Sequence, residues 1–336
     1  MSFERIVGLE PAVRLLKGQL AQGRVAHTYL FTGPEGIGKR TLALELAKAL
    51  NCEAGEQEGA ASSGRGKPCD ECGSCRKIAE GIYPDVIAVA PLEGKTEIRI
   101  DQVRDLERKV SLTPHSGRWK VGIVDGADRF SEEGMHGCLK LLEEPPPRSV
   151  ILLITSAAHR LYATVVSRSH VVRCSPQGIE KVASALRERA GLTAEQARRV
   201  AVSAGGRMGL ALRLQEGKLL SARNAALDQL LSALRRGEVE VPLGKVSRGE
   251  VGENLEWYAS WWRDLLLLSL GGDPAWVIHQ DRLEELKKLI IAGGAKRSPG
   301  VEELLDRVEQ ACFVHDAVGR NANIRTALAV LLSRNG

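Results

Sequence analysis

Residues 33–41 read Gly33-Pro34-Glu35-Gly36-Ile37-Gly38-Lys39-Arg40-Thr41, between a short apolar run and an amphipathic stretch. An apolar run, the pattern G-x-x-x-x-G-K and a helical pattern, in this order, are typical of a phosphate-binding loop. Glycines permit a tight turn whose backbone amides face phosphate oxygens, and a lysine at this position reaches the terminal phosphates. The stretch predicts a P-loop α/β fold, with Gly33, Gly36, Gly38 and Lys39 as candidate phosphate-binding residues.

Two departures from this motif affect the same chemistry. The residue after the lysine is normally Ser or Thr, whose hydroxyl binds Mg²⁺. Here it is Arg40, and Thr41 follows one residue late, about 100° further round the helix. A later apolar run ends at Asp125, the candidate Mg²⁺-side carboxylate. Hydrolysing ATPases carry a Glu at the next position to orient water, but this chain has Gly126. Asp128 lies three residues after Asp125 and is no obvious substitute for that Glu. We therefore assign Thr41 and Asp125 to a degenerate nucleotide site, which can hold a phosphate but is not expected to form a productive ATP–Mg²⁺ complex.

Five short apolar runs alternate with amphipathic stretches along residues 1–175. The runs are Tyr29-Leu30-Phe31, Val86-Ile87-Ala88-Val89, Val121-Gly122-Ile123-Val124, Val150-Ile151-Leu152-Leu153-Ile154 and Val171-Val172. Between them, apolar residues recur every three or four positions, the pattern of a helix with one buried face. Such alternation predicts an α/β unit with a five-stranded, largely parallel sheet.

The pattern changes after Ser175-Pro176. Residues 178–217 read as three short helices, the second opening with a capping box at Thr193–Gln196. From about Leu219 the pattern is helical to the end, with breaks at residues 271–274 and 293–294. We therefore predict three domains: an α/β domain over 1–175, a small helical domain over 176–217 and an all-α domain over 218–336.

Four of the seven cysteines form a ligand-like pattern: Cys69, Cys72 and Cys75 are separated by two residues each, and Cys52 precedes them. Four thiolates at such spacing typically bind tetrahedral Zn²⁺, with no coordination position left open for catalysis. We predict a structural zinc site in an insertion over about residues 52–75. A redox pair and an iron–sulfur cluster are weaker alternatives, because a dithiol needs fewer cysteines and the ferredoxin spacings are absent.

The other cysteines and the rest of the insertion have simpler interpretations. Cys138, Cys174 and Cys312 are expected to be buried small apolar residues. The stretch Glu53–Pro68 is rich in Gly, Ala, Ser and Glu and is expected to be a flexible loop.

The composition excludes several classes of protein. Hydrophobic residues make up 43% of the chain, yet no segment approaches the roughly 18 uninterrupted apolar residues of a membrane span. The first residues lack the layout of a secretory signal, so we expect a cytoplasmic globular protein without a membrane partner. The net charge is only +5 and aromatic residues make up 4%, which disfavours the remaining alternative of a free-standing, zinc-dependent DNA-binding protein.

Several stretches together resemble the bacterial clamp-loader subunits of the AAA+ class, and among them the delta-prime subunits of DNA polymerase III. The stretches are Ile6–Glu10, His27–Gly33, Leu139–Pro146, Thr164–Ser169 and Asn321–Arg325. The third is similar to the family's Leu-Glu-Glu-Pro-Pro helix end, and the fourth to its Ser-Arg-Cys motif, with Ser169 in place of Cys. A four-cysteine insertion after the phosphate-loop helix is also found in this family.

The resemblance implies an AAA+ P-loop domain followed by a helical lid domain and a helical collar domain. Delta-prime subunits often have a defective phosphate loop and act as stators. Arg168 matches the family's arginine finger, which points into the ATP site of a neighbouring motor subunit. Ser167 is expected to position that loop rather than to act as a nucleophile. Motor subunits carry a nucleotide-sensing Arg where this chain has Met208, with Arg207 one residue early.

The resemblance also implies a function in DNA replication. As a component of DNA polymerase III with little or no ATPase activity of its own, such a subunit helps to load the sliding clamp on primed DNA. Its expected partners are the tau/gamma and delta subunits and, through the complex, the clamp and the DNA. The alternative is an ATP-hydrolysing, tau/gamma-like motor subunit, against which Arg40, Gly126 and Met208 argue.

Overall fold

The computed structural model describes residues 3, 6–56, 68–92, 95–236, 248–291, 300–320 and 322–332. By its contacts the chain divides into two compact units: Met1–Ala185 with Arg207–Leu210, and Leu186–Gly206 with Ala211–Gly336. The finer division into three domains stays a prediction. Glu53–Glu56, the first residues of the predicted flexible loop Glu53–Pro68, instead form a 3-10 helix. Residues 57–67 of that loop lie outside the described residues. The predicted helix break at 293–294 and Asn321 also lie outside them.

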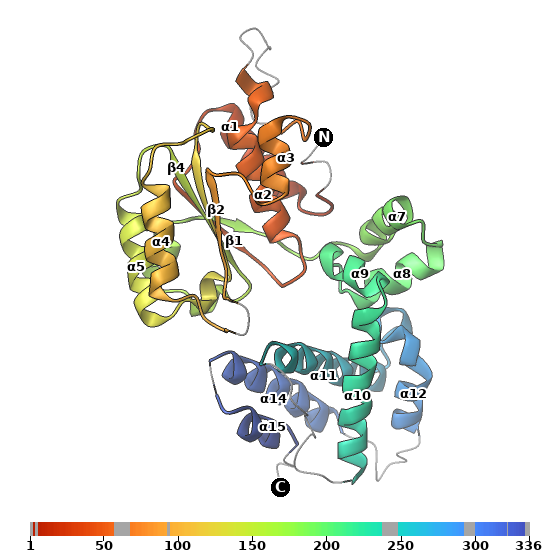
Figure 1. Ribbon diagram of the computed structural model, residues 1–336. Coiled ribbons are helices and arrows are strands. Elements are labelled where there is room, and N and C mark those ends of the chain that lie inside the picture. Colours follow the sequence, from red (N-terminus) through yellow and green to blue (C-terminus); the bar gives the residue numbers. More distant parts are fainter. Residues whose placement is uncertain are drawn as a thin grey trace. The chain divides into compact units, whose positions relative to one another are not determined.

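A five-stranded parallel sheet lies at the centre of the first unit (Figure 1). Its strands are β1 Thr28–Thr32, β2 Val86–Val89, β3 Lys120–Asp125, β4 Ser149–Thr155 and β5 His170–Arg173, in the spatial order β2-β3-β4-β1-β5. β4 lies between β3 and β1 and is buried along its whole length, which explains why its sequence is apolar without alternation. The predicted α/β class and all five predicted strands are confirmed.

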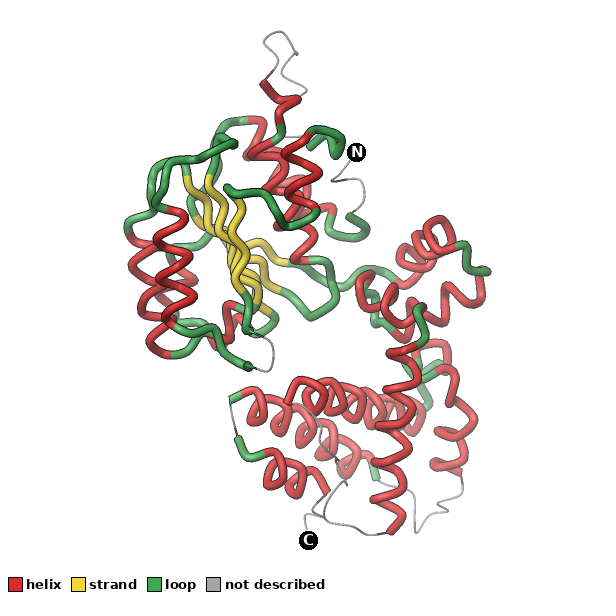
Figure 2. The backbone as a smooth tube through the Cα atoms, in the orientation of Figure 1, coloured by secondary structure: helices red, strands yellow, loops and turns green. Residues whose placement is uncertain are grey.

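Helices cover both faces of this sheet (Figure 2). α1 Glu10–Ala21, α2 Lys39–Asn51 and α3 Gly73–Ala79 lie on one side, and α4 Ile100–Val110 and α5 Glu132–Glu143 on the other; a short helix, α6 Ala163–Ser167, precedes β5. Neighbouring residues of β4 belong to different cores: Leu152 packs in the cluster that contains α2, and Leu153 in the cluster that contains α4 and α5. Because the strands are parallel, the loops after β1 and β3 lie at the same edge of the sheet, where ligands of such folds bind.

The described chain after β5 contains helices and no strand. The three predicted short helices are present as α7 Ile179–Ala190, α8 Ala194–Ser203 and α9 Met208–Gln215. α8 opens with the predicted capping box, in which Thr193 and Gln196 bond each other's backbone amides. The remaining α-helices are α10 Lys218–Arg236, α11 Arg248–Ser269, α12 Leu283–Ile291, α14 Val301–Gly319 and α15 Ile324–Leu332. None of the helices in the described ranges is at once long and apolar enough to cross a bilayer.

Cys312 corrects one expectation from the sequence. Cys138 and Cys174 are buried as expected, but Cys312 is exposed. The buried positions of α14 are Leu304, Arg307, Ala311, Val314 and Val318. Cys312 directly follows Ala311, which places it about 100° round the helix from this buried stripe. Its thiol therefore lies at the surface.

Asp85, immediately before β2, anchors the loop that leads into β3. Its fully buried carboxylate accepts hydrogen bonds from the backbone amides of His115, Ser116 and Gly117 at 2.7–2.8 Å, and Lys120 Nζ lies 2.7 Å away. Burial alone would raise the pKa of Asp85, but Lys120 and the three amides favour the charged form and hold the pKa at about 2. This buried ion pair fixes the start of β3, the strand that ends at Asp125.

The change Asp85→Asn should lower the free energy of unfolding at pH 7 by about 3 kcal/mol, because it leaves the buried Lys120 ammonium without a partner. The folded-state pKa lies below the unfolded value of 3.8. The carboxylate's contribution is therefore present above pH 3.8 and is lost as the pH falls towards 2. Urea denaturation at pH 7 and pH 3 should show the difference between the two proteins shrinking at pH 3. Asp105→Asn, a control at a half-buried position on α4 whose ion pairs to Arg108 and Lys109 lie at the surface, should change stability little. An equal loss in both variants would contradict the assignment.

Candidate functional site

The glycines of the phosphate loop are fixed by the backbone. The loop connects β1 to α2, and Gly33, Gly36 and Gly38 all have positive φ angles, 148°, 75° and 104°. A Cβ atom on Gly33 would lie 2.1 Å from the carbonyl oxygen of Cys174, so no other residue fits this close approach. Gly38 stands directly before α2, whose first residue is Lys39. The loop thus has the strand–turn–helix context that the motif requires.

Lys39 is buried in this loop without a negatively charged partner. Its side chain donates to the carbonyl oxygens of Gly33 at 2.5 Å and Pro34 at 2.9 Å, and the residue is only 7% exposed. Among the described residues, no carboxylate forms an ion pair with it. Burial lowers the pKa of Lys39, and more distant acidic groups, Cys174 and Glu35 foremost, oppose this only in part. A buried ammonium bonded only to carbonyls is electrostatically poised to receive an anion.

Arg40 is the described residue that pairs with Asp125 at the end of β3. The two side chains form an ion pair, with 3.7 Å between Arg40 Nε and Asp125 Oδ2. Thr41, which follows, is exposed. The structure therefore brings a guanidinium to the acid at the end of β3, where the motif would bring a hydroxyl.

Asp128 is engaged with the neighbouring strand. It accepts hydrogen bonds from Thr155 Oγ1 at 2.6 Å and from the Ser156 amide at 3.3 Å, at the end of β4. Gly126, between Asp125 and the short turn that contains Asp128, has no side chain to orient a water molecule. The Asp128–Thr155 pair was not predicted from the sequence, because its members are 27 residues apart.

The start of α9 packs on the phosphate loop. The Leu210 amide donates to the Gly36 carbonyl at 3.1 Å, and Arg207 Nη1 donates to the Glu35 carbonyl at 3.4 Å. A Cβ atom on Gly209 would lie 2.8 Å from the Gly36 oxygen, so this approach requires glycine. Met208, at the position expected from the resemblance to sense nucleotide, is buried, and Arg207 contacts the backbone of the loop.

Arg168 lies at the C-terminal end of α6 and is held by its own helix and by α5. Its Nη2 atom lies 2.9 Å from Glu143 Oε1 at the end of α5, and Nη1 donates to the Thr164 carbonyl at 3.2 Å. Ser167 Oγ donates to the same carbonyl at 3.1 Å. The Arg168 side chain is 38% exposed. A guanidinium has five N–H groups, more than these two contacts use.

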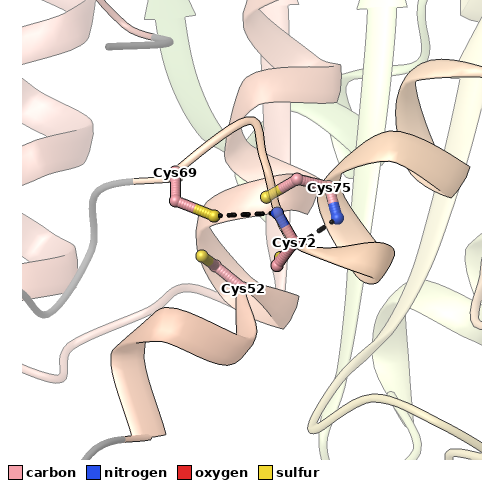
Figure 3. A group of neighbouring side chains, drawn as sticks. All are labelled: Cys52, Cys69, Cys72 and Cys75. Atoms are coloured by element: carbon pink, nitrogen blue, oxygen red, sulfur yellow. Dashed lines mark hydrogen bonds between the residues drawn. The ribbon is translucent and has the colours of Figure 1, made fainter.

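The four predicted cysteine ligands lie together in Figure 3. Cys52 follows α2, Cys72 caps the start of α3 and Cys75 lies in its first turn. The sulfur atoms of Cys52, Cys69, Cys72 and Cys75 all lie within 4.8 Å of one another. Four sulfurs at about 2.3 Å from one tetrahedral ion are about 3.8 Å apart, so the cluster has metal-binding dimensions.

The environment of Cys69 favours its thiolate. Burial opposes this, but backbone amides, including that of Cys72 at 3.3 Å from the sulfur, lower the pKa of Cys69 to about 7. Burial raises the pKa of Cys52 and of Cys75. A cation would therefore have to displace protons from the buried thiols, as metal binding to cysteines generally does.

A buried ion-pair network supports the cysteine loop and was missed in the sequence. Lys48 Nζ on α2 lies 2.8 Å from Glu45 Oε1 and 2.9 Å from Asp70 Oδ1, and all three groups are largely buried. Asp70 has a positive φ angle of 64° within the Cys69–Cys72 loop. On the other side of the cluster, Glu53 accepts from the amide and hydroxyl of Ser74 at the start of α3. The one sequence signal for this network was the presence of Glu45 and Lys48 among the apolar residues of α2.

Comparison with known proteins agrees with the layout of the first unit. A family model described as DNA polymerase III, delta subunit, matches residues 8–178. The tau subunit of DNA polymerase III from Bacillus subtilis is 30% identical over 319 residues, which cover 91% of this chain and 52% of the relative. The tau subunit from Escherichia coli is 35% identical over 167 residues, 50% of this chain and 24% of the relative. The chain thus spans about half, or less, of the length of these curated relatives.

Solved structures from Thermotoga maritima also align with most of the chain. A DNA polymerase III gamma-subunit-related protein has 18% identity and a TM-score of 0.40, with 97% of each chain covered. The Holliday junction branch migration motor RuvB has 16% identity and a TM-score of 0.44, with 87% of this chain and 90% of that chain covered.

The change Lys48→Met should lower the free energy of unfolding by about 3 kcal/mol, because it leaves the buried carboxylates of Glu45 and Asp70 without their cation. Lys77→Met, on the exposed side of α3, removes the same charge and should have little effect. Chemical denaturation of the two variants at pH 7 measures the difference. Equal stabilities of the two variants would show that the network does not support the cysteine loop.

Proposed function

The chain belongs to the DNA polymerase III delta-subunit family of AAA+ clamp-loader proteins, and we propose that within this family it is a non-hydrolysing stator of the delta-prime type. It holds ATPase subunits in a ring and donates Arg168 in trans to the ATP site of a neighbour. The assembled complex opens a sliding clamp and loads it on primed DNA.

The pairing of Arg40 with Asp125 is the observation that supports this proposal most strongly. ATP hydrolysis in P-loop proteins requires Mg²⁺ held by the hydroxyl after the lysine and by the acid at the end of the third strand. Here the hydroxyl is replaced by a guanidinium that pairs with the acid at 3.7 Å. Gly126 also lacks the carboxylate that would orient water. Two groups that hydrolysis uses are thus missing: the hydroxyl that Arg40 replaces and the carboxylate that Gly126 replaces.

The placement of Arg168 supports a role in a neighbour's ATP site. Its bonds to Glu143 and Thr164 hold the side chain on α5 and α6, and the side chain is partly exposed. Ser167, bonded to the same Thr164 carbonyl, helps to fix the end of α6. A guanidinium presented in this way stabilises the charge that develops on a transferred phosphoryl group.

A second candidate function is an ATP-hydrolysing motor subunit, which the names of the relatives favour. The relatives from Bacillus subtilis and Escherichia coli are tau subunits rather than delta-prime subunits. A motor, however, needs a Mg²⁺ ligand after Lys39 and an acid after Asp125, and this chain has Arg40 and Gly126. The stator proposal therefore agrees better with the local chemistry.

We further propose partners that follow from a place in the clamp loader. These are tau/gamma and delta subunits in direct contact, and the sliding clamp and primed DNA through the complex. The collar role would belong to the helices after residue 217. The proposed place of action is the cytoplasm, where bacterial DNA is replicated.

We also propose that the four cysteines hold a structural Zn²⁺ ion. When bound, the ion supplies a cross-link between the end of α2, at Cys52, and the start of α3, at Cys72 and Cys75. All four ligands come from the protein, so no position stays open for a substrate. The site would keep the insertion folded and leave nucleotide chemistry to other parts of the chain.

Replacing Arg168 by Ala should reduce the DNA- and clamp-stimulated ATPase rate of the reconstituted complex by about 10³-fold or more, the effect of losing an arginine finger. Assembly, measured by size-exclusion chromatography, should be unchanged. Arg173→Ala, on the exposed side of β5, is the matched control and should keep full activity. An unchanged ATPase rate in the assembled Arg168→Ala complex would refute the proposed role.

The purified chain should contain about one zinc ion per molecule by elemental analysis, because its four clustered thiols match one tetrahedral site. Cys72→Ser should lose most of this zinc and lower the melting temperature, whereas Cys312→Ser, which changes an exposed cysteine outside the cluster, should change neither. Equal zinc contents in the two variants, or iron in place of zinc, would argue against the assignment.

A further inference from the structure

The P-loop fold implies a Mg²⁺ ion between bound phosphates and the protein, and the residues present do not fit one. The position after Lys39 offers the Arg40 guanidinium, which cannot coordinate a cation. The hydroxyl of Thr41 is exposed one step further round α2. Asp125, the other expected ligand, already has a positive partner in Arg40 at 3.7 Å. A divalent cation would have to displace this partner and would still lack its second protein ligand.

We propose that Arg40 replaces Mg²⁺ in this loop, so that the site binds a nucleoside polyphosphate as the metal-free anion. This inference rests on the proposed function and deepens it, because it names the form of ligand that a non-hydrolysing site takes. The guanidinium pairs with Asp125, the acid that faces the metal ion in hydrolysing relatives of the fold. It does so without supplying the metal that hydrolysis requires.

The charges at the edge of the sheet agree with this ligand. Lys39 is a buried ammonium whose only described hydrogen-bond partners are the Gly33 and Pro34 carbonyls, and no described carboxylate forms an ion pair with it. Arg40 gives Asp125 a positive partner at 3.7 Å. An anion in the loop would meet Lys39, the amides at the start of α2 and no unpaired carboxylate from Asp125.

Arg40 also has the donors that such a role needs. Only its Nε side faces Asp125, and the side chain is 67% exposed. Among the described contacts it makes no other ion pair or hydrogen bond. A guanidinium is always charged at physiological pH and presents five N–H groups, so one edge can face Asp125 and another can face a phosphate. A lysine in its place would keep the charge but not this geometry.

Isothermal titration of the full chain with ADP, in buffer freed of divalent cations by a chelating resin and in excess MgCl₂, tests the inference directly. The wild-type chain should bind ADP in the metal-free buffer, and excess MgCl₂ should weaken this binding by about threefold or more, because it converts free ADP into its Mg²⁺ complex. Lys39→Ala should abolish binding in both buffers. Absence of ADP binding by the wild-type chain, or binding that requires MgCl₂, would overturn the proposal.

Substitution of Arg40 distinguishes its role from a general loss of the site. Arg40→Ser restores the hydroxyl and frees Asp125, so MgCl₂ should now strengthen ADP binding by about tenfold or more. Arg40→Lys, the matched control, keeps the charge without a hydroxyl, so MgCl₂ should weaken its ADP binding as it does in the wild-type chain. If MgCl₂ does not strengthen ADP binding in Arg40→Ser, Arg40 is not the substitute for the metal.

A spectroscopic readout separates metal binding from nucleotide affinity. With Mn²⁺ as the probe, electron paramagnetic resonance should detect protein-bound Mn²⁺ in the Arg40→Ser variant with ADP and none in the wild-type chain. Protein-bound Mn²⁺ in the wild-type chain would contradict the inference. These results do not depend on Arg168, so the trans-ATPase assay of Arg168→Ala tests the proposed function separately.

Discussion

A buried lysine without an ion-pair partner, at the carboxyl edge of the sheet, is the constraint on which the site depends. Lys39 is buried against two carbonyls, and Asp125, at the end of β3, is paired with Arg40. Glycines that tolerate positive φ angles bring the loop close enough to bury the lysine, and the start of α9 packs on the same loop through Leu210. The fold thus keeps the geometry of a phosphate loop, while Arg40 stands where the usual hydroxyl would bind a metal ion.

Other elements of the first unit carry different tasks. The cysteine cluster joins α2 to α3 and is supported by the buried Lys48 network, away from the chemistry of the loop. Arg168 lies on α6, tied to the end of α5, with part of its guanidinium in solvent. An exposed arginine on α6, in a chain whose own loop has Arg40 where a Mg²⁺ ligand is usual, agrees with the proposed subunit that assists a neighbour.

The sequence predicted those features that depend on local pattern. Continuous apolar runs identified all five strands, Thr193–Gln196 identified a helix start, and cysteine spacing identified four side chains that lie together. Pairings between distant residues were not predictable: Asp85 with Lys120, Lys48 with Asp70, and Arg40 with Asp125 depend on how strands and helices are stacked. The prediction that Cys312 is buried was wrong, because the type of a residue does not determine which side of a helix it lies on.

Steady-state ATP hydrolysis by the purified chain in Mg²⁺, compared with its Lys39→Ala variant, tests the central claim most directly. A loop without Mg²⁺ ligands should give no turnover above that of Lys39→Ala. Turnover by the wild-type chain that disappears in Lys39→Ala would contradict the claim and identify the protein as a motor subunit.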